Sequence, residues 1–193
     1  MAKNIAVIGS GVGGYVAAIR AAQLGAQVTL IEKDTLGGTC LNRGCIPAKS
    51  LLESADILTV IRNAPAFGIS VEKASVDFSA VTKRKEAAVK QLVDGVAFLM
   101  RKNKIRVIEG IGTLIDPKTI GILDKSDRIN ADSIIIATGS KPGTVPTKGI
   151  DETGVINSDG ALTMEQLPKS IVVIGGGVIG LELAQLMYKL GSK

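Results

Sequence analysis

The segment NIAVIGSGVGG, residues 4–14, decides the fold of this chain, because a short apolar run leads directly into a glycine-rich turn. Small and apolar residues follow over residues 15–24, which is typical of a helix that packs closely on a sheet. A second apolar run, QVTLIE at residues 27–32, comes after Gly25, which ends that helix. We therefore expect residues 4–32 to form a strand, a turn, a helix and a second strand with a right-handed crossover.

The composition favours a layered α/β fold. Of the 193 residues 46% are hydrophobic, but only three are Phe and two are Tyr, and Trp is absent. A core of Val, Ile, Leu and Ala is typical of parallel strands buried under helices. The length allows one complete domain and part of a second. We expect a doubly wound, Rossmann-like α/β domain.

The middle of the chain shows helical patterns followed by strand patterns. We expect a helix over residues 48–62 entered through Pro47, irregular or extended chain over 67–76, and an amphipathic helix over 78–103 that Gly95 weakens without ending. Residues 105–136 carry short strand patterns separated by turn residues, which predicts a small β-meander inserted into the sheet. Prolines and glycines make residues 141–154 a natural linker.

The segment SIVVIGGGVIG, residues 170–180, repeats the pattern of the first strand and turn. It predicts the first βα unit of a second nucleotide-binding fold. We therefore expect a first domain over residues 1–150 and the truncated start of a second over residues 151–193.

A nucleotide site is predicted at the first glycine-rich turn, where Gly9, Gly11 and Gly14 form a GxGxxG pattern. Such glycines permit a tight turn and a close approach of the backbone to a pyrophosphate, which the helix N-terminus stabilises. Glu32 ends the second strand 23 residues after Gly9, where its carboxylate suits a ribose. A glycine-rich turn without a ligand is the alternative.

Gly175, Gly177 and Gly180 repeat the same spacing. The residue that would read the second ribose is expected about 23 residues after Gly175, beyond Lys193. The choice between NAD and NADP therefore does not follow from these residues.

The two cysteines of the chain, Cys40 and Cys45, lie in GGTCLNRGCIPAK, residues 37–49. Five positions of ideal helix would hold their Cα atoms farther apart than the ~7 Å that a disulfide spans, so we expect a loop or distorted turn at Gly44. Cys45 would then lie at the start of a helix, which favours its thiolate. A redox-active pair is the favoured interpretation, and two inert buried cysteines are the alternative.

Several other classes of function are disfavoured. A structural disulfide is unusual in a reducing compartment, and a zinc site lacks ligands because the chain has two thiols and no histidine. The net charge is +5, but the basic residues of 83–106 follow a helical stripe without aromatic neighbours, so a solvated helix face is favoured over nucleic-acid binding. No apolar run reaches the ~20 residues of a membrane span, and the first residues are unlike a signal peptide. We expect a cytoplasmic protein without metal, nucleic-acid or membrane partners.

Two further features carry little weight by themselves. Lys49 lies one turn into the predicted helix, where a surface lysine is as good an explanation as a functional one. ATGS at residues 137–140 is also a common way for a strand to end.

The whole chain resembles the flavin-dependent pyridine nucleotide-disulfide oxidoreductases. Its motifs stand in the order found in that family: the first GxGxxG unit, the redox segment of residues 37–49, IIIATGS at residues 134–140, and the second GxGxxG unit. Residues 45–52 and 87–114 resemble the dihydrolipoamide dehydrogenases of the family more than its glutathione or mercuric reductases. The resemblance implies FAD and NAD as cofactors, with the FAD-binding domain in residues 1–150 and the NAD-binding domain beginning after it.

The resemblance also implies a role for individual residues. Cys40 is implied to exchange with the substrate, and Cys45 to face the flavin. Lys49 is implied to lie beside flavin N5 and to pair with Glu182. The residues implied to hold FAD are Gly9, Gly11, Gly14, Glu32, Lys33, Gly38, Thr39, Gly112, Thr138, Gly139 and Ser140, while Gly175, Gly177 and Gly180 are implied to hold the nicotinamide cofactor.

The implied reaction passes electrons from the lipoyl groups of 2-oxoacid dehydrogenase complexes through the cysteine pair and FAD to NAD, in a homodimer. The family's acid–base histidine belongs to a C-terminal interface domain, and this chain has no histidine. We therefore expect an N-terminal fragment that lacks lipoamide turnover and holds FAD weakly. Another flavoprotein disulfide reductase and a non-catalytic flavin-binding or redox-sensing module remain as alternatives.

Overall fold

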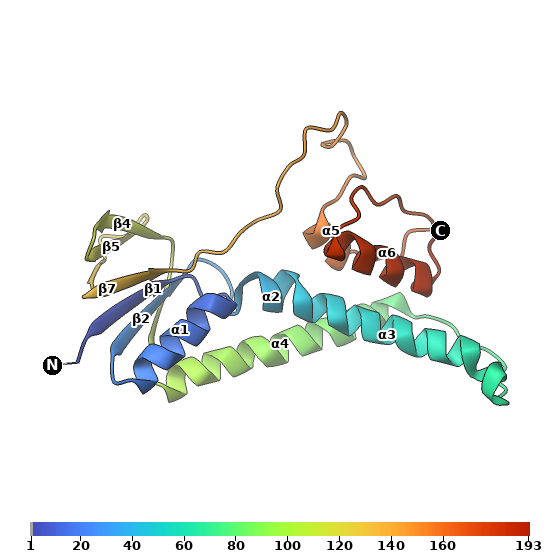
Figure 1. The fold of residues 1–193 in the computed structure, drawn as a ribbon, viewed down its shortest axis with the longest axis horizontal. Coiled ribbons are helices and arrows are strands. Elements are labelled where there is room, and N and C mark those ends of the chain that lie inside the picture. The colour runs from blue at the N-terminus through green and yellow to red at the C-terminus, as the bar shows by residue number, and fades with distance from the viewer. Residues whose placement is uncertain (1) are drawn as a thin grey trace. The chain divides into compact units, whose positions relative to one another are not determined.

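The computed structural model describes residues 2–193, which fall into two compact units (Figure 1). The first unit contains the residues up to Asn42 together with Lys90–Ser140, and the second contains Arg43–Val89 and Lys141–Lys193. Each unit is thus built from two separate stretches of chain. This grouping cuts across the boundary expected near residue 150, so the division into domains 1–150 and 151–193 stays a prediction.

A parallel sheet forms the centre of the first unit. Its strands are β1 (Asn4–Ile8), β2 (Gln27–Glu32), β3 (Arg106–Glu109) and β7 (Ser133–Ile136), in the order β3-β2-β1-β7. All three pairings are parallel. Helix α1 (Val12–Gln23) connects β1 to β2, so the βαβ unit predicted for residues 4–32 is confirmed.

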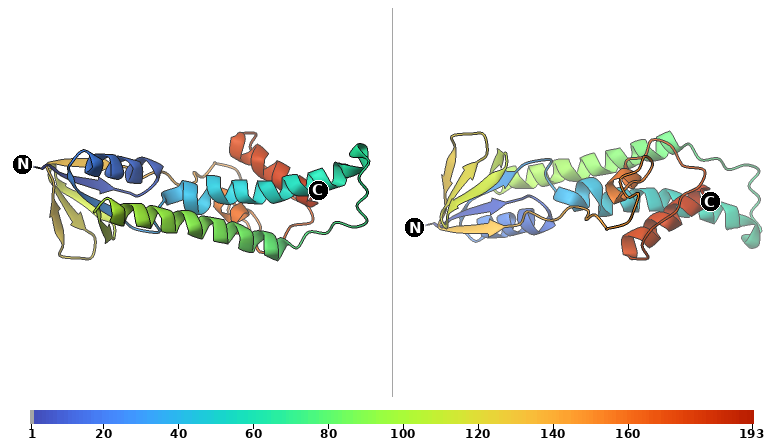
Figure 2. Two further views of the ribbon diagram at one scale, coloured as in Figure 1. Left: turned by 90° about the horizontal axis from the view of Figure 1, so that it is seen from below. Right: turned by 90° about the horizontal axis from the view of Figure 1, so that it is seen from above.

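An antiparallel meander covers one face of this sheet, with α1 on the other (Figure 2). It consists of β4 (Gly112–Asp116), β5 (Thr119–Ile122) and β6 (Arg128–Asn130). The two layers share a core of Ala6, Ile8, Ile31, Ile120, Ile122, Ile129 and Ala131. The predicted meander is confirmed for its central part, whereas the apolar runs at its two ends join the parallel sheet as β3 and β7, where they are paired with β2 and β1.

Helices dominate the second unit. They are α3 (Cys45–Asn63), the short 3-10 helix η1 (Ala64–Phe67), α5 (Ser158–Leu162) and α6 (Val178–Leu190). Two more helices have residues in both units: α2 (Gly38–Arg43) and α4 (Phe78–Lys102). The range of α4 confirms the predicted amphipathic helix. The core of the second unit consists of Leu51, Ala55, Leu58, Leu162, Leu186, Met187 and Leu190.

Helix α3 starts at Cys45 and not after Pro47 as expected. Pro47 is buried at the third helical position, where its missing N–H is still one of those that have no partner inside a helix. The helix therefore begins two to three residues before the predicted boundary.

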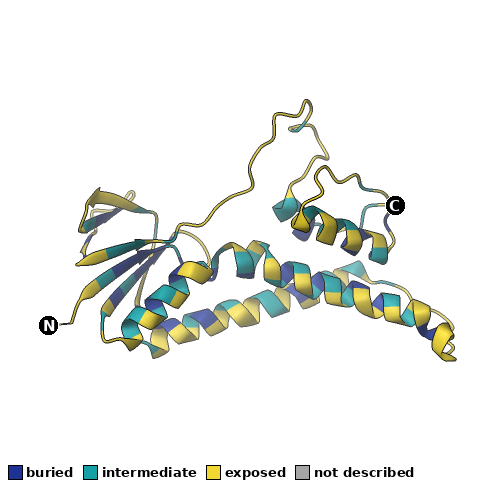
Figure 3. Cartoon of the chain, in the orientation of Figure 1, coloured by how far each residue is buried: buried dark blue, intermediate teal, exposed yellow. Residues whose placement is uncertain are grey.

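The apolar run before the second glycine motif forms no strand, contrary to expectation. Residues 171–176 carry no regular secondary structure, and most of them are exposed (Figure 3). Val172 and Ile174 are among the exposed apolar residues. A strand needs a neighbour for its backbone N–H and C=O groups. Among the described residues only Ile171 of this run has a backbone hydrogen bond of the kind found between separate segments, to the carbonyl of Lys193.

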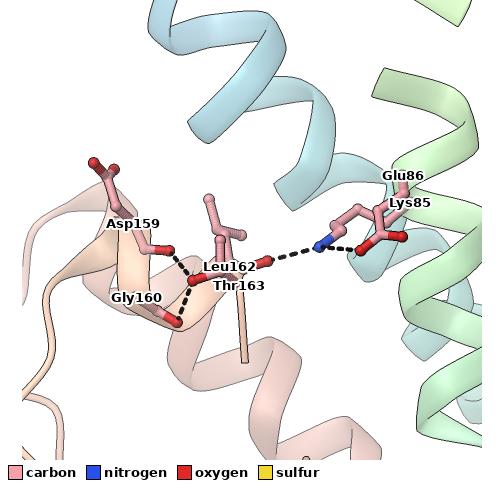
Figure 4. A network of polar contacts seen from close by, with 6 residues as sticks. All are labelled: Lys85, Glu86, Asp159, Gly160, Leu162 and Thr163. Carbon is pink, nitrogen blue, oxygen red and sulfur yellow. Dashed lines mark hydrogen bonds and ion pairs between the residues drawn. The ribbon is translucent and has the colours of Figure 1, made fainter. Parts of the chain in front are cut away.

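A buried lysine connects two helices of the second unit. Lys85 of α4 is 6% exposed, and its Nζ donates to the carbonyl oxygen of Leu162, at the end of α5, over 3.0 Å (Figure 4). Glu86 lies 3.9 Å from the same Nζ. Because buried charges need partners, this contact ties α5 to α4.

Among the described residues, no helix combines the length and the apolar character that crossing a membrane requires.

Candidate functional site

The first glycine motif forms a tight turn between β1 and α1. Gly9 has a φ of +99°, and a Cβ added to it would lie 2.2 Å from the carbonyl oxygen of Ala137. A Cβ on Gly14 would lie 1.8 Å from the carbonyl oxygen of Gly9. Position 9 therefore requires glycine because of its backbone conformation and because the end of β7 lies close to it. Position 14 requires glycine because α1 starts so close to the turn.

The start of α1 is suited to an anion. Gly11 caps the helix with extended backbone, and the first helical bond runs from the N–H of Tyr15 to the carbonyl of Gly11 over 2.9 Å. No acidic residue lies in the first turn. The N–H groups at this end and the positive end of the helix dipole are thus available to a phosphate.

Glu32 is oriented by hydrogen bonds at the end of β2. Its Oε2 accepts from the N–H of Ser10 at 2.7 Å and from the Ser10 hydroxyl at 2.6 Å, and its Oε1 accepts from the N–H of Asp34 at 2.9 Å. Glu32 is 8% exposed and Ser10 is fully buried. The carboxylate is therefore fixed before any ligand binds. Oε2 already accepts two hydrogen bonds, whereas Oε1 accepts one and keeps a further lone-pair site.

Ser10 was not singled out from the sequence. Its hydroxyl donates to Glu32 and lies 3.3 Å from the N–H of Gly37, so it connects the first turn to the redox segment. The signal was available, because a serine between two glycines of a buried turn must find partners for its hydroxyl.

A cavity of about 190 Å³ lies at the carboxyl ends of the parallel strands, where ligands bind in folds of this kind. This volume is below that of common ligand pockets and fits part of a dinucleotide. The predicted residues that line it are Gly9, Gly11, Glu32, Lys33, Gly38, Thr39, Gly112, Thr138 and Gly139.

Two predicted residues, Gly14 and Ser140, do not line this cavity. Gly14 is buried beneath the turn and acts through packing, and Ser140 is exposed after the end of β7. The cavity also contains residues that the sequence did not single out, namely Ile8, Ile31, Gly110, Ile111 and Ala137.

The redox segment approaches the first glycine turn through backbone atoms. Gly38 has a φ of +62°, and a Cβ added to it would lie 2.5 Å from the Cα of Gly11. Two glycines therefore face each other across the cavity wall, and any side chain at position 38 would displace the turn.

The two cysteines lie on separate helices. Cys40 is half-buried in α2, and Cys45 is exposed at the first position of α3. Gly44 interrupts the two helices with a φ of −141° and a ψ of −114°. The break predicted at Gly44 is confirmed, but Cys40 lies in a six-residue helix and not in a loop.

Lys49 and Glu182 lie on α3 and α6 of the second unit, and both are exposed. Within the described residues no hydrogen bond or ion pair joins them. Two exposed charged side chains gain little free energy from pairing, so the absence of a contact here is unsurprising. Their pairing stays a prediction.

The second glycine motif repeats the local geometry of the first. Gly175 has a φ of +116°, Gly177 caps α6 with extended backbone, and a Cβ on Gly180 would lie 2.4 Å from the carbonyl oxygen of Gly175. The N–H of Leu181 bonds to the carbonyl of Gly177 over 3.0 Å. The turn forms even though no strand precedes it.

Comparison with known proteins gives a consistent result along the whole chain. The family model described as pyridine nucleotide-disulphide oxidoreductase matches residues 3–193. A dihydrolipoyl dehydrogenase of Chlamydia trachomatis is 47% identical, and the match covers 100% of this chain and 42% of the relative. One from Bacillus subtilis is 43% identical over 98% of this chain and 42% of the relative. The chain thus spans about two fifths of the length of these relatives.

A solved structure shares the fold. The HOCl-induced flavoprotein disulfide reductase RclA from Escherichia coli superposes with a TM-score of 0.84 at 30% identity, covering 98% of this chain and 40% of that one. Together with the parallel sheet, this similarity confirms the expected α/β, Rossmann-like fold.

Proposed function

Because the chain belongs to the pyridine nucleotide-disulphide oxidoreductase family, we propose that it forms the flavin-binding and dithiol part of an enzyme of the dihydrolipoamide dehydrogenase type. The observation that carries the proposal is the cavity at the carboxyl ends of β1 and β2, where nine of the residues implied to hold FAD come together. Relatives at 43% and 47% identity over nearly the entire chain favour this type.

The residues of the cavity fit the adenine-nucleotide half of FAD. Gly11 and Gly38 leave room for backbone to approach a pyrophosphate, and the first turn of α1 carries no acidic side chain to repel it. Glu32, held by Ser10, suits the ribose hydroxyls. Gly112, Thr138 and Gly139 line the same cavity from β4 and the end of β7.

The cysteine pair, in its disulfide form, would take two electrons from the substrate by thiol-disulfide exchange. One substrate thiolate attacks the sulfur of Cys40 in the Cys40–Cys45 disulfide, and Cys45 leaves as a thiolate. The second substrate thiolate then displaces Cys40, so the substrate becomes a disulfide and the enzyme a dithiol. Bound FAD supplies the transfer of these two electrons to a nicotinamide cofactor.

Three elements of this chain support those steps by position. Cys45 begins the 19-residue helix α3, whose N-terminus stabilises a thiolate. Lys49, one turn further along, would lie beside the flavin and pair with Glu182. The turn of Gly175, Gly177 and Gly180 would hold the pyrophosphate of NAD.

The wider assignment concerns the complete enzyme. We assign to it the lipoyl groups of 2-oxoacid dehydrogenase complexes as substrates, a homodimeric state and a cytoplasmic location. The acid–base histidine expected in the family has no counterpart in these 193 residues. Turnover of lipoamide by the complete enzyme would therefore require a histidine outside them.

The proposal is tested by adding FAD to the chain and reducing it with a dithiol under anaerobic conditions. A long-wavelength absorbance band should form, because a thiolate at Cys45 contacts the oxidised flavin. Cys45→Ser should abolish the band, and Cys40→Ser should retain it. Bound flavin that shows no band in the wild-type chain, or a band that survives Cys45→Ser, would contradict the assignment of the thiols.

A second candidate is another flavoprotein disulfide reductase, favoured by the structural similarity to RclA from Escherichia coli. The complete protein distinguishes the two when lipoamide, glutathione and mercuric ion are assayed side by side. Preference for either of the last two would favour the second candidate.

A further inference from the structure

Helices α3 and α6 pack against each other in the second unit and run in the same general direction, crossing at an angle in the views of Figure 2 (Figures 1 and 2). Their contact is made mainly by leucines, with Leu51, Ala55 and Leu58 on α3 and Leu186, Met187 and Leu190 on α6. A slide of α6 by one turn along α3 would replace one leucine contact by another. A leucine-rich face of this kind buries apolar area but specifies register poorly.

Two polar contacts at the carboxyl end of α6 can specify the register that the leucine contacts do not. Lys189 Nζ lies 2.5 Å from Asp56 Oδ1. The Nη1 of Arg62 donates to the carbonyl oxygen of Lys189 over 2.7 Å. Residue 189 is thus bound to α3 at two points, through its side chain and through its backbone, and a slide along α3 would break both.

The spacing of charged residues is the same on the two helices. Lys49 precedes Asp56 by seven residues on α3, and Glu182 precedes Lys189 by seven residues on α6. Seven residues are close to two helical turns, so each pair lies on one face of its helix. Because the two helices run in the same general direction, the register that places Lys189 beside Asp56 also determines how near Glu182 lies to Lys49, a pair in which the two charges are reversed.

The amino end of α6 has no comparable attachment among the described residues. Val178, Ile179 and Leu181 are exposed, and the Glu182 side chain has no hydrogen bond or ion pair with any residue that the structure describes. The position of Glu182 therefore depends on how the carboxyl half of α6 is held.

We propose that the Asp56–Lys189 ion pair, together with the bond from Arg62, fixes the register of α6 on α3 and thereby positions Glu182 opposite Lys49. Asp56, Lys189 and Arg62 are positioning residues, and none of them is assigned to the flavin site itself. The inference rests on the proposed function only in treating Lys49 and Glu182 as the pair to be positioned. The Lys189 side chain is 21% exposed and that of Asp56 is 54% exposed. A polar contact that selects one register among several apolar ones is a well-attested use of polar groups at helix interfaces.

The register can be measured as a distance between spin labels at positions 49 and 182. The carrier is the 193-residue chain with Cys40→Ser, Cys45→Ser, Lys49→Cys and Glu182→Cys, studied by double electron–electron resonance. With Asp56 and Lys189 intact, we expect a single narrow distance peak. Asp56→Asn should replace it by a broad or split distribution, because α6 then samples neighbouring registers.

Exchange of the two charges, Asp56→Lys with Lys189→Asp, should restore the narrow peak, which a loss of stability alone would not explain. Lys90→Met breaks the exposed Lys90–Asp94 pair within α4 and should leave the distribution unchanged. Circular dichroism confirms that each variant is folded.

A narrow peak that is unaffected by Asp56→Asn would overturn the proposal in favour of register set by the leucines. A broad distribution in the parent chain would overturn it as well. Neither result depends on flavin binding or turnover. The proposed function is tested separately, by the long-wavelength absorbance band.

Discussion

The two glycine motifs have nearly the same local structure and very different surroundings. Gly9 and Gly175 both have positive φ values, +99° and +116°, and Gly14 and Gly180 both lie close to the carbonyl oxygen of the first glycine. Yet β1 before the first motif is paired on both sides, whereas residues 171–176 before the second form no strand. The first motif also has Glu32 fixed beside it.

This difference separates what a short sequence determines from what requires partners. A glycine turn and the helix after it are stabilised by residues that are close in sequence. A strand requires backbone partners from elsewhere in the chain. The second motif therefore has the turn without a paired strand before it, whereas the first has the same turn preceded by a strand of the parallel sheet.

Adding a methyl group at the third glycine of each motif should give the largest contrast. Gly14→Ala places a Cβ against the Gly9 carbonyl under a paired sheet, so we expect the free energy of unfolding to fall by about 3–5 kcal/mol. Gly180→Ala meets the corresponding oxygen where no sheet resists adjustment, and we expect a loss below about 1 kcal/mol. Urea denaturation followed by circular dichroism measures both.

Gly13→Ala is the matched control, because its Cβ would meet nothing within 4 Å and Ala favours the helix. Equal losses for Gly14→Ala and Gly180→Ala would show that the sheet does not distinguish the motifs.

Neutralising the carboxylate beside the first motif should have the next largest effect. Glu32→Gln keeps the shape but replaces a charged acceptor of three hydrogen bonds, for an expected loss of about 2 kcal/mol in the free energy of unfolding. Thermal denaturation checks the value. The side chain of Glu182, on the helix of the second motif, has no hydrogen bond or ion pair within residues 2–193, so Glu182→Gln should leave the midpoint unchanged. A similar shift in both variants would contradict the special role of Glu32.

The second unit can be perturbed in the same way through its buried lysine. Lys85→Met should cost about 1–2 kcal/mol of unfolding free energy, because the carbonyl of Leu162 loses its partner while the aliphatic contacts remain. Lys85→Met should accelerate hydrogen exchange in α5 more than in β1 or β2. Lys83→Met, two positions earlier on the same helix but exposed, is the control and should have no measurable effect.

The smallest expected effect is on the pH dependence of stability, through Asp116 of the meander. The meander packs on the sheet of the first motif, and the second motif has no counterpart among the described residues. The backbone N–H of Lys118 and the Thr119 hydroxyl lower the pKa of Asp116 below its ordinary value of 3.8. A carboxyl whose pKa is lowered on folding stabilises the fold above the unfolded pKa and loses that contribution as pH falls through the folded value. Asp116→Asn should therefore be slightly less stable than the parent near neutral pH.

The difference between Asp116→Asn and the parent chain should shrink below about pH 4 and vanish once the pH is below the folded pKa of Asp116, which is lower than 3.8. A difference that stays constant over this range would mean that the charge is not responsible. Thermal unfolding across a pH series gives the result.

The sequence was informative wherever periodicity or a motif carried the signal. The strands of residues 4–8 and 27–32, the glycine turn and the long helix α4 all followed from apolar spacing and from glycine positions. Glu32 was found because its distance from Gly9 places it at the end of the second strand.

The features that were missed depend on contacts between distant residues. Ala137 limits the space at Gly9 because β7 pairs beside β1, and Ser10 is defined by its bond to Glu32. The missing strand before Gly175 shows the same dependence in reverse, because an apolar run of the right composition stayed unpaired. Helix α2 around Cys40 was missed since six residues carry too little periodicity.

The most direct test of the account is FAD affinity after the same substitution in the two motifs. Gly11→Ala fills the space where backbone approaches a pyrophosphate, with its Cβ no closer than 4.0 Å to other protein atoms, and Gly177→Ala is the equivalent change at the second turn. Titration followed by flavin fluorescence should give one FAD per parent chain and per Gly177→Ala chain, and binding at least about tenfold weaker for Gly11→Ala. Binding that is lost in Gly177→Ala and retained in Gly11→Ala would contradict the placement of the flavin at the first motif.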